Sequence, residues 1–462
     1  MNKKEFDKII EAQKEPMVRM LQEWIRIPSL KSDPEPGAPF GRELRRMLDK
    51  VLSDCESLGF AVNDIDGYAG DAKMGEGADE DALGILAHID VVPAGDGWHR
   101  DPFGAQLEGD LLFGRGTSDD KGPLAAALFA MKAVKDAGIP LKRKVTLIFG
   151  CDEESGMEDM KYYKENAVMP KSGFSPDGSY PLINLEKGSC TLHLSAEAAR
   201  DGLKVLELKV GERQNVIPGA ATALVEGDAS FIEKVEAVSE KYGWPVEAMM
   251  EGEAVRIRAI GMNGHAAYPE SARNAIGQLL ITLKELGVTG PLATLAEKIG
   301  TQYYGEGLGI AVRDEASGPL TCNMGIIRLE EGRLFATLDI RAPLLAAGER
   351  LHGIVQAHLP GIKVTQVSLK PPHYVPESSE LVQKLLDAYH EVTGRGRATL
   401  STGGGTYARM LQQGVAFGAS FPEDPDVAHQ ANEYIIISKL MQSVKIFAYA
   451  IIKLAGEEGA LQ

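Results

Sequence analysis

Two short apolar runs, each followed at once by acidic or histidine side chains, constrain the fold of this chain most strongly. The first covers residues 82–87 and ends in His88-Ile89-Asp90, and the second covers residues 145–150 and leads into Cys151-Asp152-Glu153-Glu154. Runs of this length that are apolar throughout are typical of strands buried on both faces of a parallel sheet. An Ala-rich helix is expected between them, over residues 123–135. The pattern therefore predicts an α/β fold in which parallel strands alternate with helices.

Beyond about residue 183 the pattern changes to strands in which apolar and polar residues alternate. Such strands are expected at 191–194, 205–210, 255–260 and 334–340, with helices at 229–241 and 272–286. Alternation is typical of a sheet with one solvated face, so this region is predicted to be an α+β insertion. We expect a discontinuous main domain of residues 1–182 and 377–462, with a mainly parallel sheet flanked by helices. The inserted domain would span residues 183–376. Near the N-terminus, residues 4–25 have helical spacing, with a break expected near Pro16.

Charge and composition exclude several kinds of partner. The 462 residues include 49 basic and 66 acidic side chains, a formal net charge of −17, and protonating all nine histidines would still leave −17 + 9 = −8. Proteins that bind nucleic acid or an anionic membrane usually carry a basic surface, so neither partner is expected. No secretory or membrane-spanning segment is recognisable. The four cysteines form no CxxC pair, which predicts reduced thiols and a cytoplasmic protein.

Acidic and histidine side chains collect where the buried strands are expected to end, which is where open α/β sheets bind ligands. Taken singly, each has an ordinary explanation as a surface histidine, a solvated acidic pair or a turn residue. Together they form a set of nitrogen and oxygen donors that suits Zn²⁺ or Mn²⁺, with Co²⁺ as a further option. Asp90 stands two residues from His88 in extended chain, so both side chains point the same way and Asp90 can hydrogen-bond the imidazole.

At these motifs the chain resembles the two-metal, co-catalytic zinc metallopeptidases, a family that includes aminoacylases, desuccinylases, carnosinases and carboxypeptidases. The resemblance is carried by residues 88–93 (HIDVVP), 114–122 (GRGTSDDKG), 152–156 (DEESG) and the late His429. Bacterial dipeptidases of this family are also similar at residues 24–29 (WIRIPS), 175–177 (SPD), 213–219 (RQNVIPG) and 264–269 (GHAAYP). The motifs occur in the order of the family, and the resemblance covers essentially the whole chain. It implies that the main domain is catalytic and that the insertion is a lid that binds substrate.

The resemblance implies two divalent metal ions, Zn²⁺ above all, with Mn²⁺ or Co²⁺ as alternatives. One ion would be held by His88, Asp120 and Asp177, and the other by Asp120, Glu154 and His429. Asp120 would bridge the two ions, and Asp119 is the competing candidate for that position. Glu153 would act as general base toward the water between the ions, and Asp90 would support His88.

The resemblance also implies how a peptide is held. His265, from the lid, would donate a hydrogen bond to the tetrahedral oxyanion, and Arg341 would pair with the carboxylate of the substrate. Asn215 and the backbone of Gly404 and Thr406 would assist. The implied activity is hydrolysis of dipeptides with free ends, by a monomer because the enlarged lid supplies His265 within one chain. Two alternatives stay open: an N-acyl-amino-acid deacylase or desuccinylase of the same family, and a catalytically inactive peptide-binding protein.

Overall fold

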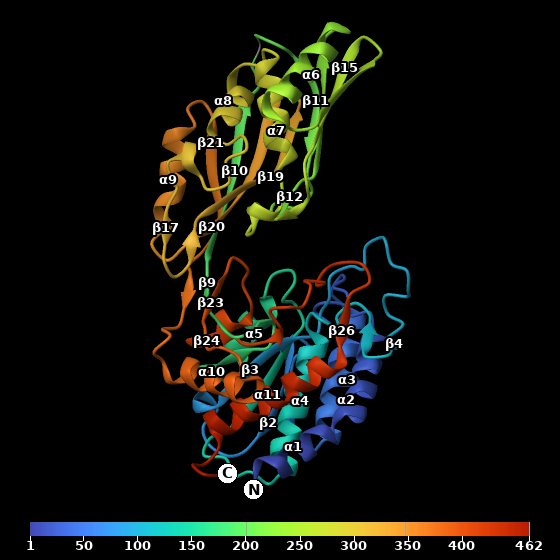
Figure 1. Cartoon of the computed structure of the whole chain (residues 1–462), viewed down its shortest axis with the longest axis vertical. Helices are drawn as coiled ribbons and strands as arrows, with labels where there is room; N and C mark the ends of the chain where they lie inside the picture. The colour runs from blue at the N-terminus through green and yellow to red at the C-terminus, as the bar shows by residue number, and fades with distance from the viewer. Residues whose placement is uncertain (200, 347, 462) are drawn as a thin grey trace. The chain divides into compact units, whose positions relative to one another are not determined.

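The chain folds into two compact units, each with a hydrophobic core of its own. The computed structural model describes residues 1–199, 201–346 and 348–461. Unit 1 comprises Met1–Asn184, Tyr374–Leu400 and Gly405–Gln462, and unit 2 comprises Leu185–His373 and Ser401–Gly404. Because both ends of the chain belong to unit 1 (Figure 1), unit 2 is an insertion in its sequence. Among the described residues, no helix is long and apolar enough to cross a membrane.

Unit 1 is built on a mixed sheet with the strand order β1-β2-β6-β3-β7-β24-β9-β22, and β23 pairs with β9. Its centre is parallel and consists of β6 (Val145–Gly150), β3 (Leu83–His88), β7 (Ser172–Ser175) and β24 (Gln413–Ala416). The flanking strands are β1 (Ala61–Ile65), β2 (Ala69–Met74), β9 (Ile183–Glu186), β22 (His373–Tyr374) and β23 (Leu400–Thr402). Strands β1, β2 and β9 pair antiparallel with their neighbours. Every residue of β3 and β6 is buried, so the two apolar runs are the central strands that the sequence predicts.

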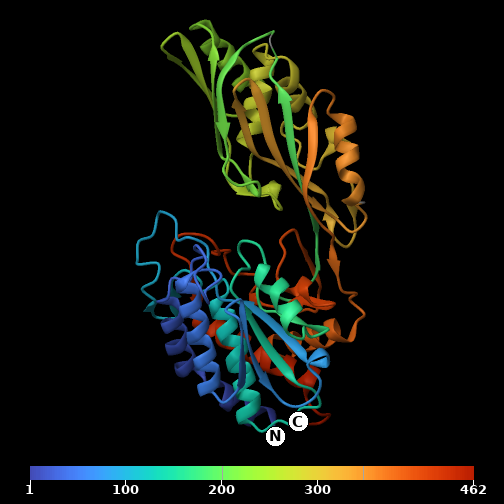
Figure 2. The ribbon, with the colours of Figure 1, turned by 180° about the vertical axis from the view of Figure 1, so that it is seen from behind.

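Helices cover the sheet of unit 1. They are α1 (Lys3–Glu11), α2 (Lys14–Ile25), α3 (Arg42–Ser57), α4 (Lys121–Asp136), α5 (Glu158–Asn166), α10 (Glu380–Thr393) and α11 (Ile437–Ala455). Figure 1 shows α4, α10 and α11 in front of the strands, and Figure 2 shows the strands from the opposite side. The break expected near Pro16 falls earlier, between α1 and α2. Pro16 lies in the first turn of α2, where its missing N–H would have no partner in the helix anyway.

Unit 2 contains an antiparallel sheet with the strand order β14-β15-β13-β11-β19-β20-β10-β21. In that order the strands are Val246–Glu251, Ala254–Ile260, Ala220–Glu226, Val205–Val210, Thr321–Glu330, Arg333–Ala342, Gly188–Glu197 and Lys363–Lys370. The helices of this unit are α6 (Ser230–Tyr242), α7 (Ala275–Glu285), α8 (Gly290–Lys298) and α9 (Gly348–His358). Buried and more exposed positions alternate over residues 255–260 of β15, one of the strands for which the sequence predicts alternation.

Several short elements position loops of both units. In unit 1, β26 (Tyr434–Ile436), β5 (Leu111–Phe113) and β4 (Gln106–Glu108) form a small sheet, and β8 (Gly178–Ser179) pairs with β25 (Ala419–Ser420). In unit 2, β12 (Val216–Ile217) pairs with β16 (Gly264–His265), and β17 (Arg313–Asp314) pairs with β18 (Gly318–Pro319). Single 3-10 turns occur at Asp79–Asp81, Pro269–Ser271, Glu306–Leu308 and Tyr407–Met410.

Candidate functional site

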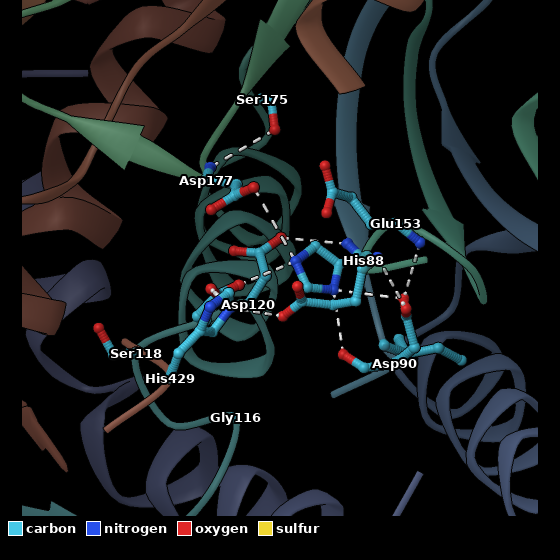
Figure 3. Close-up of polar contacts among 12 residues, drawn as sticks. His88, Asp90, Gly116, Ser118, Asp120, Glu153, Ser175, Asp177 and His429 are labelled. Atoms are coloured by element: carbon cyan, nitrogen blue, oxygen red, sulfur yellow. Dashed lines mark hydrogen bonds and ion pairs between the residues drawn. The ribbon is translucent and has the colours of Figure 1, made fainter. Parts of the chain in front are cut away.

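The carboxyl ends of three neighbouring parallel strands bring the predicted site residues of unit 1 together. His88 is the last residue of β3, Glu153 and Glu154 follow β6, and Asp177 follows β7. These strands lie side by side in the order β6-β3-β7, so their carboxyl ends meet at one edge of the sheet. Figure 3 shows His88, Glu153, Asp177 and His429 around a common centre.

The carboxylate of Asp119 lies between two histidines from distant parts of the chain. Its Oδ1 is 2.9 Å from Nε2 of His88, and its Oδ2 is 3.1 Å from Nε2 of His429. On the His429 side, Oε1 of Glu154 is 2.8 Å from the same Nε2. On the His88 side, Oδ2 of Asp177 is 3.9 Å from Nε2 of His88. One carboxylate therefore faces two separate groups of donors, each with one imidazole and one further carboxylate.

The carboxylate of the neighbouring Asp120 has different partners. Asp120 is fully buried and its Oδ2 accepts a hydrogen bond of 3.1 Å from the backbone N–H of His88. Its Oδ1 has no hydrogen-bond partner among the described residues. The structure thus places Asp119, the competing candidate, between the two groups of donors, whereas Asp120 contacts the backbone of His88. The two aspartates are adjacent just before α4, and their order in the motif does not say which side chain turns toward the histidines.

Asp90 holds two parts of the site. The Nδ1 atom of His88 lies 3.0 Å from the backbone oxygen of Asp90 and 3.4 Å from its Oδ1. A hydrogen bond at Nδ1 leaves the lone pair of Nε2 directed at the centre, as a metal ligand requires. The Asp90 carboxylate also accepts the backbone N–H groups of Glu153 and Glu154, each at 3.1 Å. The sequence predicts the contact with His88, but it gives no sign of this second role.

Burial and crowding of carboxylates dominate the electrostatics of the site. Burial raises the pKa of Glu153 well above its usual value, and the nearby Asp177 and Glu154 raise it further against the influence of His88. Burial and the charge of Asp119 raise the pKa of Asp177 to about 7. Burial acts in the same direction on Asp119, but hydrogen bonds from His429 and His88 outweigh it and hold the pKa of that carboxyl well below its usual value.

The donor set fits divalent metal ions. The donors of His88, Glu153 and Asp177 lie within 4.8 Å of one another, as do those of His88, Asp119 and Glu154. Carboxylates crowded in this way repel one another, and cations among them would relieve that repulsion. Imidazole nitrogens combined with carboxylate oxygens are the ligands of catalytic Zn²⁺ and of related ions. A cavity of about 310 Å³ adjoins Asp119 and Asp177, and its lining consists of residues 118–119, 176–179, 419–422 and 424–428.

In unit 2, Arg341 is held by its neighbours. Its Nε and Nη2 donate to the carboxylate of Asp339 at 2.6 and 2.8 Å, and its Nη1 donates to the backbone oxygen of Gly403 at 2.9 Å. Asp339 thus occupies one edge of the guanidinium. A carboxylate from a ligand would have to approach the remaining N–H groups at the Nη1–Nη2 end.

His265 and Asn215 lie on adjoining short segments of unit 2. The pairing of β12 with β16 places Val216 opposite His265, and the N–H of Ala266 donates to the backbone oxygen of Asn215 at 2.9 Å. Nδ1 of His265 accepts the N–H of Ala267 at 3.2 Å. In the neutral ring the proton must then sit on Nε2, which makes that atom a hydrogen-bond donor.

The predicted backbone contacts near residue 404 divide between the units. Gly404 belongs to unit 2, and its N–H donates to Oγ1 of Thr402 at 3.0 Å. Thr406 belongs to unit 1, and its hydroxyl accepts the N–H of Ala408 at 3.1 Å at the start of a 3-10 turn. The Thr406 side chain therefore serves as a helix cap.

A comparison with known protein families identifies the family of this chain. Residues 84–453 match the family described as Peptidase family M20/M25/M40. The chain belongs to this family. The M20 fold brings together the histidine and carboxylate donors described above, so the chain is a metallopeptidase, a hydrolase that uses divalent metal ions. The resemblance drawn from the sequence motifs is confirmed.

Curated M20 relatives are similar over nearly the whole chain. The Bacillus subtilis (strain 168) protein YtjP, whose name proposes a dipeptidase, is 36% identical over 96% of this chain and 98% of its own. The Beta-Ala-Xaa dipeptidase of Lactobacillus delbrueckii subsp. lactis is 33% identical over 98% of this chain and 99% of its own.

Solved structures share the fold at lower identity. Human carnosine dipeptidase 1 matches with a TM-score of 0.59 and 16% identity, covering 98% of each chain. The di-peptidase Dug1p of Saccharomyces cerevisiae matches with a TM-score of 0.59 and 14% identity, covering 97% of this chain and 98% of its own.

Proposed function

We propose that this M20 peptidase hydrolyses dipeptides with free amino and carboxyl ends, using a pair of divalent metal ions. One observation supports the pair above all: the two oxygens of Asp119 face Nε2 of His88 and Nε2 of His429, at 2.9 and 3.1 Å. The first ion would be held by His88, Asp119 and Asp177, and the second by Asp119, Glu154 and His429. The dipeptidase names of relatives at 33–36% identity agree with this substrate class.

The ions, when bound, would supply Lewis-acid activation of a water molecule and of the peptide carbonyl. Glu153 would take the proton of that water on its carboxylate and later pass it to the leaving amine. Its burial and its carboxylate neighbours raise its pKa, which helps it to retain the proton between the two steps. Asp90 would fix the backbone of Glu153 and Glu154, because its carboxylate accepts the N–H of each. The two side chains would then leave the backbone from fixed positions, one as general base and the other as metal ligand.

Unit 2, residues 183–376 in the sequence-based division, would bind the substrate. We propose that Arg341, braced by Asp339, pairs with the free carboxylate and that Nε2–H of His265 donates to the developing oxyanion. Asn215 and the backbone at Gly404 would assist. Recognition of a free carboxylate at one end and a free amine at the other is what would limit the substrate to two residues.

Three further properties belong to the proposal. Zn²⁺ is the first choice of metal, with Mn²⁺ or Co²⁺ as alternatives, because the three ions share imidazole and carboxylate ligands. The protein would be cytoplasmic, in keeping with four cysteines that are all free and buried. It would act as a monomer, because one chain carries both the donors of unit 1 and His265 of unit 2.

A substrate panel with a pair of variants tests the proposal. Protein stripped of metal and reloaded with Zn²⁺, Mn²⁺ or Co²⁺ is offered dipeptides, tripeptides and N-acyl amino acids, and the products are identified by mass spectrometry. We expect cleavage of dipeptides alone. Cleavage of only N-acyl amino acids would replace the proposal by a deacylase, and saturable peptide binding without cleavage under any metal would replace it by a peptide-binding protein.

The variants Asp119→Asn and Asp120→Asn test the assignment of the bridging residue. Asp119→Asn removes the charge shared by both ions, so we expect metal affinity and turnover to fall by at least about 100-fold. Asp120→Asn keeps an oxygen for the N–H of His88 and should still bind two ions. The reverse ranking of the two variants in a metal titration would overturn the assignment.

A further inference from the structure

The chain that follows His429 carries a buried glutamate back to the loop that contains Asp119. Glu433 lies four residues after His429 and directly before β26, and its side chain is fully buried. His429 and Asn432 both have a positive φ of 62°, so the chain turns tightly between the ligand candidate and the glutamate. Residues other than glycine adopt this left-handed conformation only at a cost in free energy. Surrounding contacts must therefore hold the turn.

The Glu433 carboxylate collects the backbone N–H groups of the loop before α4. Its Oε1 accepts from Gly116, Ser118 and Asp119 at 3.1, 2.8 and 3.3 Å. Gly116 and Ser118 are labelled below the centre in Figure 3. Gly116 has a φ of +89°, and a Cβ there would lie 2.8 Å from Cγ1 of Val91, so the loop needs glycine at this position. A carboxylate from the far end of the chain thus fixes the backbone of Asp119.

Arg115 connects this carboxylate to a third segment. Its Nη1 donates to Oε2 of Glu433 at 2.6 Å, and both side chains are almost fully buried, at 1% and 0% exposed. Its Nη2 donates to the backbone oxygen of Ala94 at 3.1 Å, and its guanidinium lies 5.4 Å from the centre of the Trp98 ring. Ala94 stands on the loop that leaves β3 after His88. The Arg115–Glu433 pair therefore joins the three segments that carry His88, Asp119 and His429.

We propose that Arg115 and Glu433 are positioning residues that set the spacing of Asp119 and His429, and with it the affinity for the second metal ion. This inference rests on the proposed two-metal centre. His88 has supports of its own, since its N–H donates to Asp120 and its ring bonds the backbone of Asp90. The side chain of His429 is half exposed, so its position depends on the turn that Glu433 anchors. Loss of the pair should therefore loosen the second ion more than the first.

The variant Glu433→Gln tests this inference by stepwise titration of the metal-free protein with Zn²⁺ or Mn²⁺ in a calorimeter. The amide keeps the size of the side chain, but its NH₂ group would face N–H groups that donate hydrogen bonds to the carboxylate. Donor would then face donor, and those hydrogen bonds would be lost. We expect one of the two binding steps to weaken by about 10- to 100-fold, roughly the effect of removing a partner that orients metal ligands, while the other step changes by less than about threefold. The thermal midpoint of the metal-free variant is measured in parallel to check that it is folded.

The control is Glu108→Gln, which breaks an exposed pair of similar chemistry in the same unit. Arg100 donates to Glu108 at 3.1 and 2.7 Å and lies 4.1 Å from the centre of the Phe113 ring. This control should leave both binding steps unchanged. If Glu433→Gln does not fold, Arg115→Lys takes its place, since lysine keeps the charge but cannot reproduce the two-sided contacts of the guanidinium.

Three results would decide the matter. Selective loosening of one ion in Glu433→Gln or Arg115→Lys supports the inference. Wild-type affinities at both steps, or equal loosening of both, would overturn it. A wild-type protein that binds two ions but cleaves no dipeptide would refute the proposed function alone and leave this inference standing, whereas one that binds fewer than two ions would refute both.

Discussion

Replacing Asn323 should weaken unit 2 without changing the metal centre in unit 1. Asn323 is 1% exposed, and its Nδ2 donates to the backbone oxygens of Gln214 and Val216 at 3.1 and 2.9 Å. Its Oδ1 accepts from Nδ2 of Asn274 at 2.8 Å. These bonds brace the segment that carries Asn215 and that pairs, through Val216, with His265. Asn323 is therefore a structural support of the residues proposed to bind substrate.

The structure gives the size of the effect. Asn323→Leu keeps a similar volume but removes three hydrogen bonds, each worth about 1 kcal/mol. The free energy of unfolding of unit 2 should fall by about 3 kcal/mol. The segment of Asn215 and Val216, which pairs with His265, loses this support. The kcat/KM for a dipeptide should therefore fall about 10- to 100-fold. Metal affinity should stay at the wild-type value, because the donors lie in unit 1.

Urea unfolding followed by tryptophan fluorescence measures the first quantity. Trp244 lies in unit 2, whereas Trp24 and Trp98 lie in unit 1, so a Trp244→Phe background identifies the signal of each unit. Asn263→Ala is the control, since it removes one exposed hydrogen bond, at 2.7 Å to Gly219. A loss of less than about 1 kcal/mol in Asn323→Leu, or a loss of metal affinity, would refute the reasoning.

Three further predictions concern catalysis, packing and thiol chemistry. Glu153→Gln should bind both ions in a metal titration yet lose about 10²- to 10⁴-fold in kcat, the range expected for a general base; near wild-type kcat would contradict its role. Gly173→Ala should lower the thermal midpoint and destabilise unit 1 by about 1–3 kcal/mol, because the new Cβ would lie 1.9 Å from the backbone oxygen of Gly84; an unchanged midpoint would contradict that close packing. Burial raises the pKa of Cys190 to about 11 and of Cys322 to about 12. At pH 8 both thiols should therefore be protonated and should resist a thiol reagent. Their reactivity should rise as the pH approaches these values. All four cysteines should react in urea, and rapid labelling of the native protein at pH 8 would contradict this burial.

The fold was predictable where one kind of periodicity persisted over a whole element. The apolar runs of β3 and β6 are typical of strands buried on both faces, and the alternation over residues 255–260 of β15 is typical of a sheet with one solvated face. The pairing of Arg341 with Asp339 was also readable in principle, because residues two apart in a strand point to the same face. The helix break predicted near Pro16 lies at residues 12–13, because proline ends a helix in its interior but is tolerated in its first turn.

The parts of the site that escaped prediction depend on side-chain direction or on distant pairing. Asp119 and Asp120 are neighbours of identical chemistry, and only the folded loop turns one of them toward the histidines. Arg115 and Glu433 are separated by 318 residues. For Glu433, the sequence offered one local indication of a structural role. It is a single charged residue directly before the apolar strand at 434–436, and a charge that becomes buried there needs a buried partner.

The division of the chain into units has a consequence for synthesis on the ribosome. Unit 2 begins at Leu185 and takes its last residues from Ser401–Gly404. Lys187 donates its N–H to the oxygen of Thr402 at 2.8 Å, and Arg341 binds Gly403. Unit 1 begins first but receives β24 and α11 only from the last 50 residues of the chain. Chains grow from the N-terminus and domains tend to fold as units. During synthesis, unit 2 can therefore be complete while the sheet of unit 1 still lacks strand β24 and helix α11.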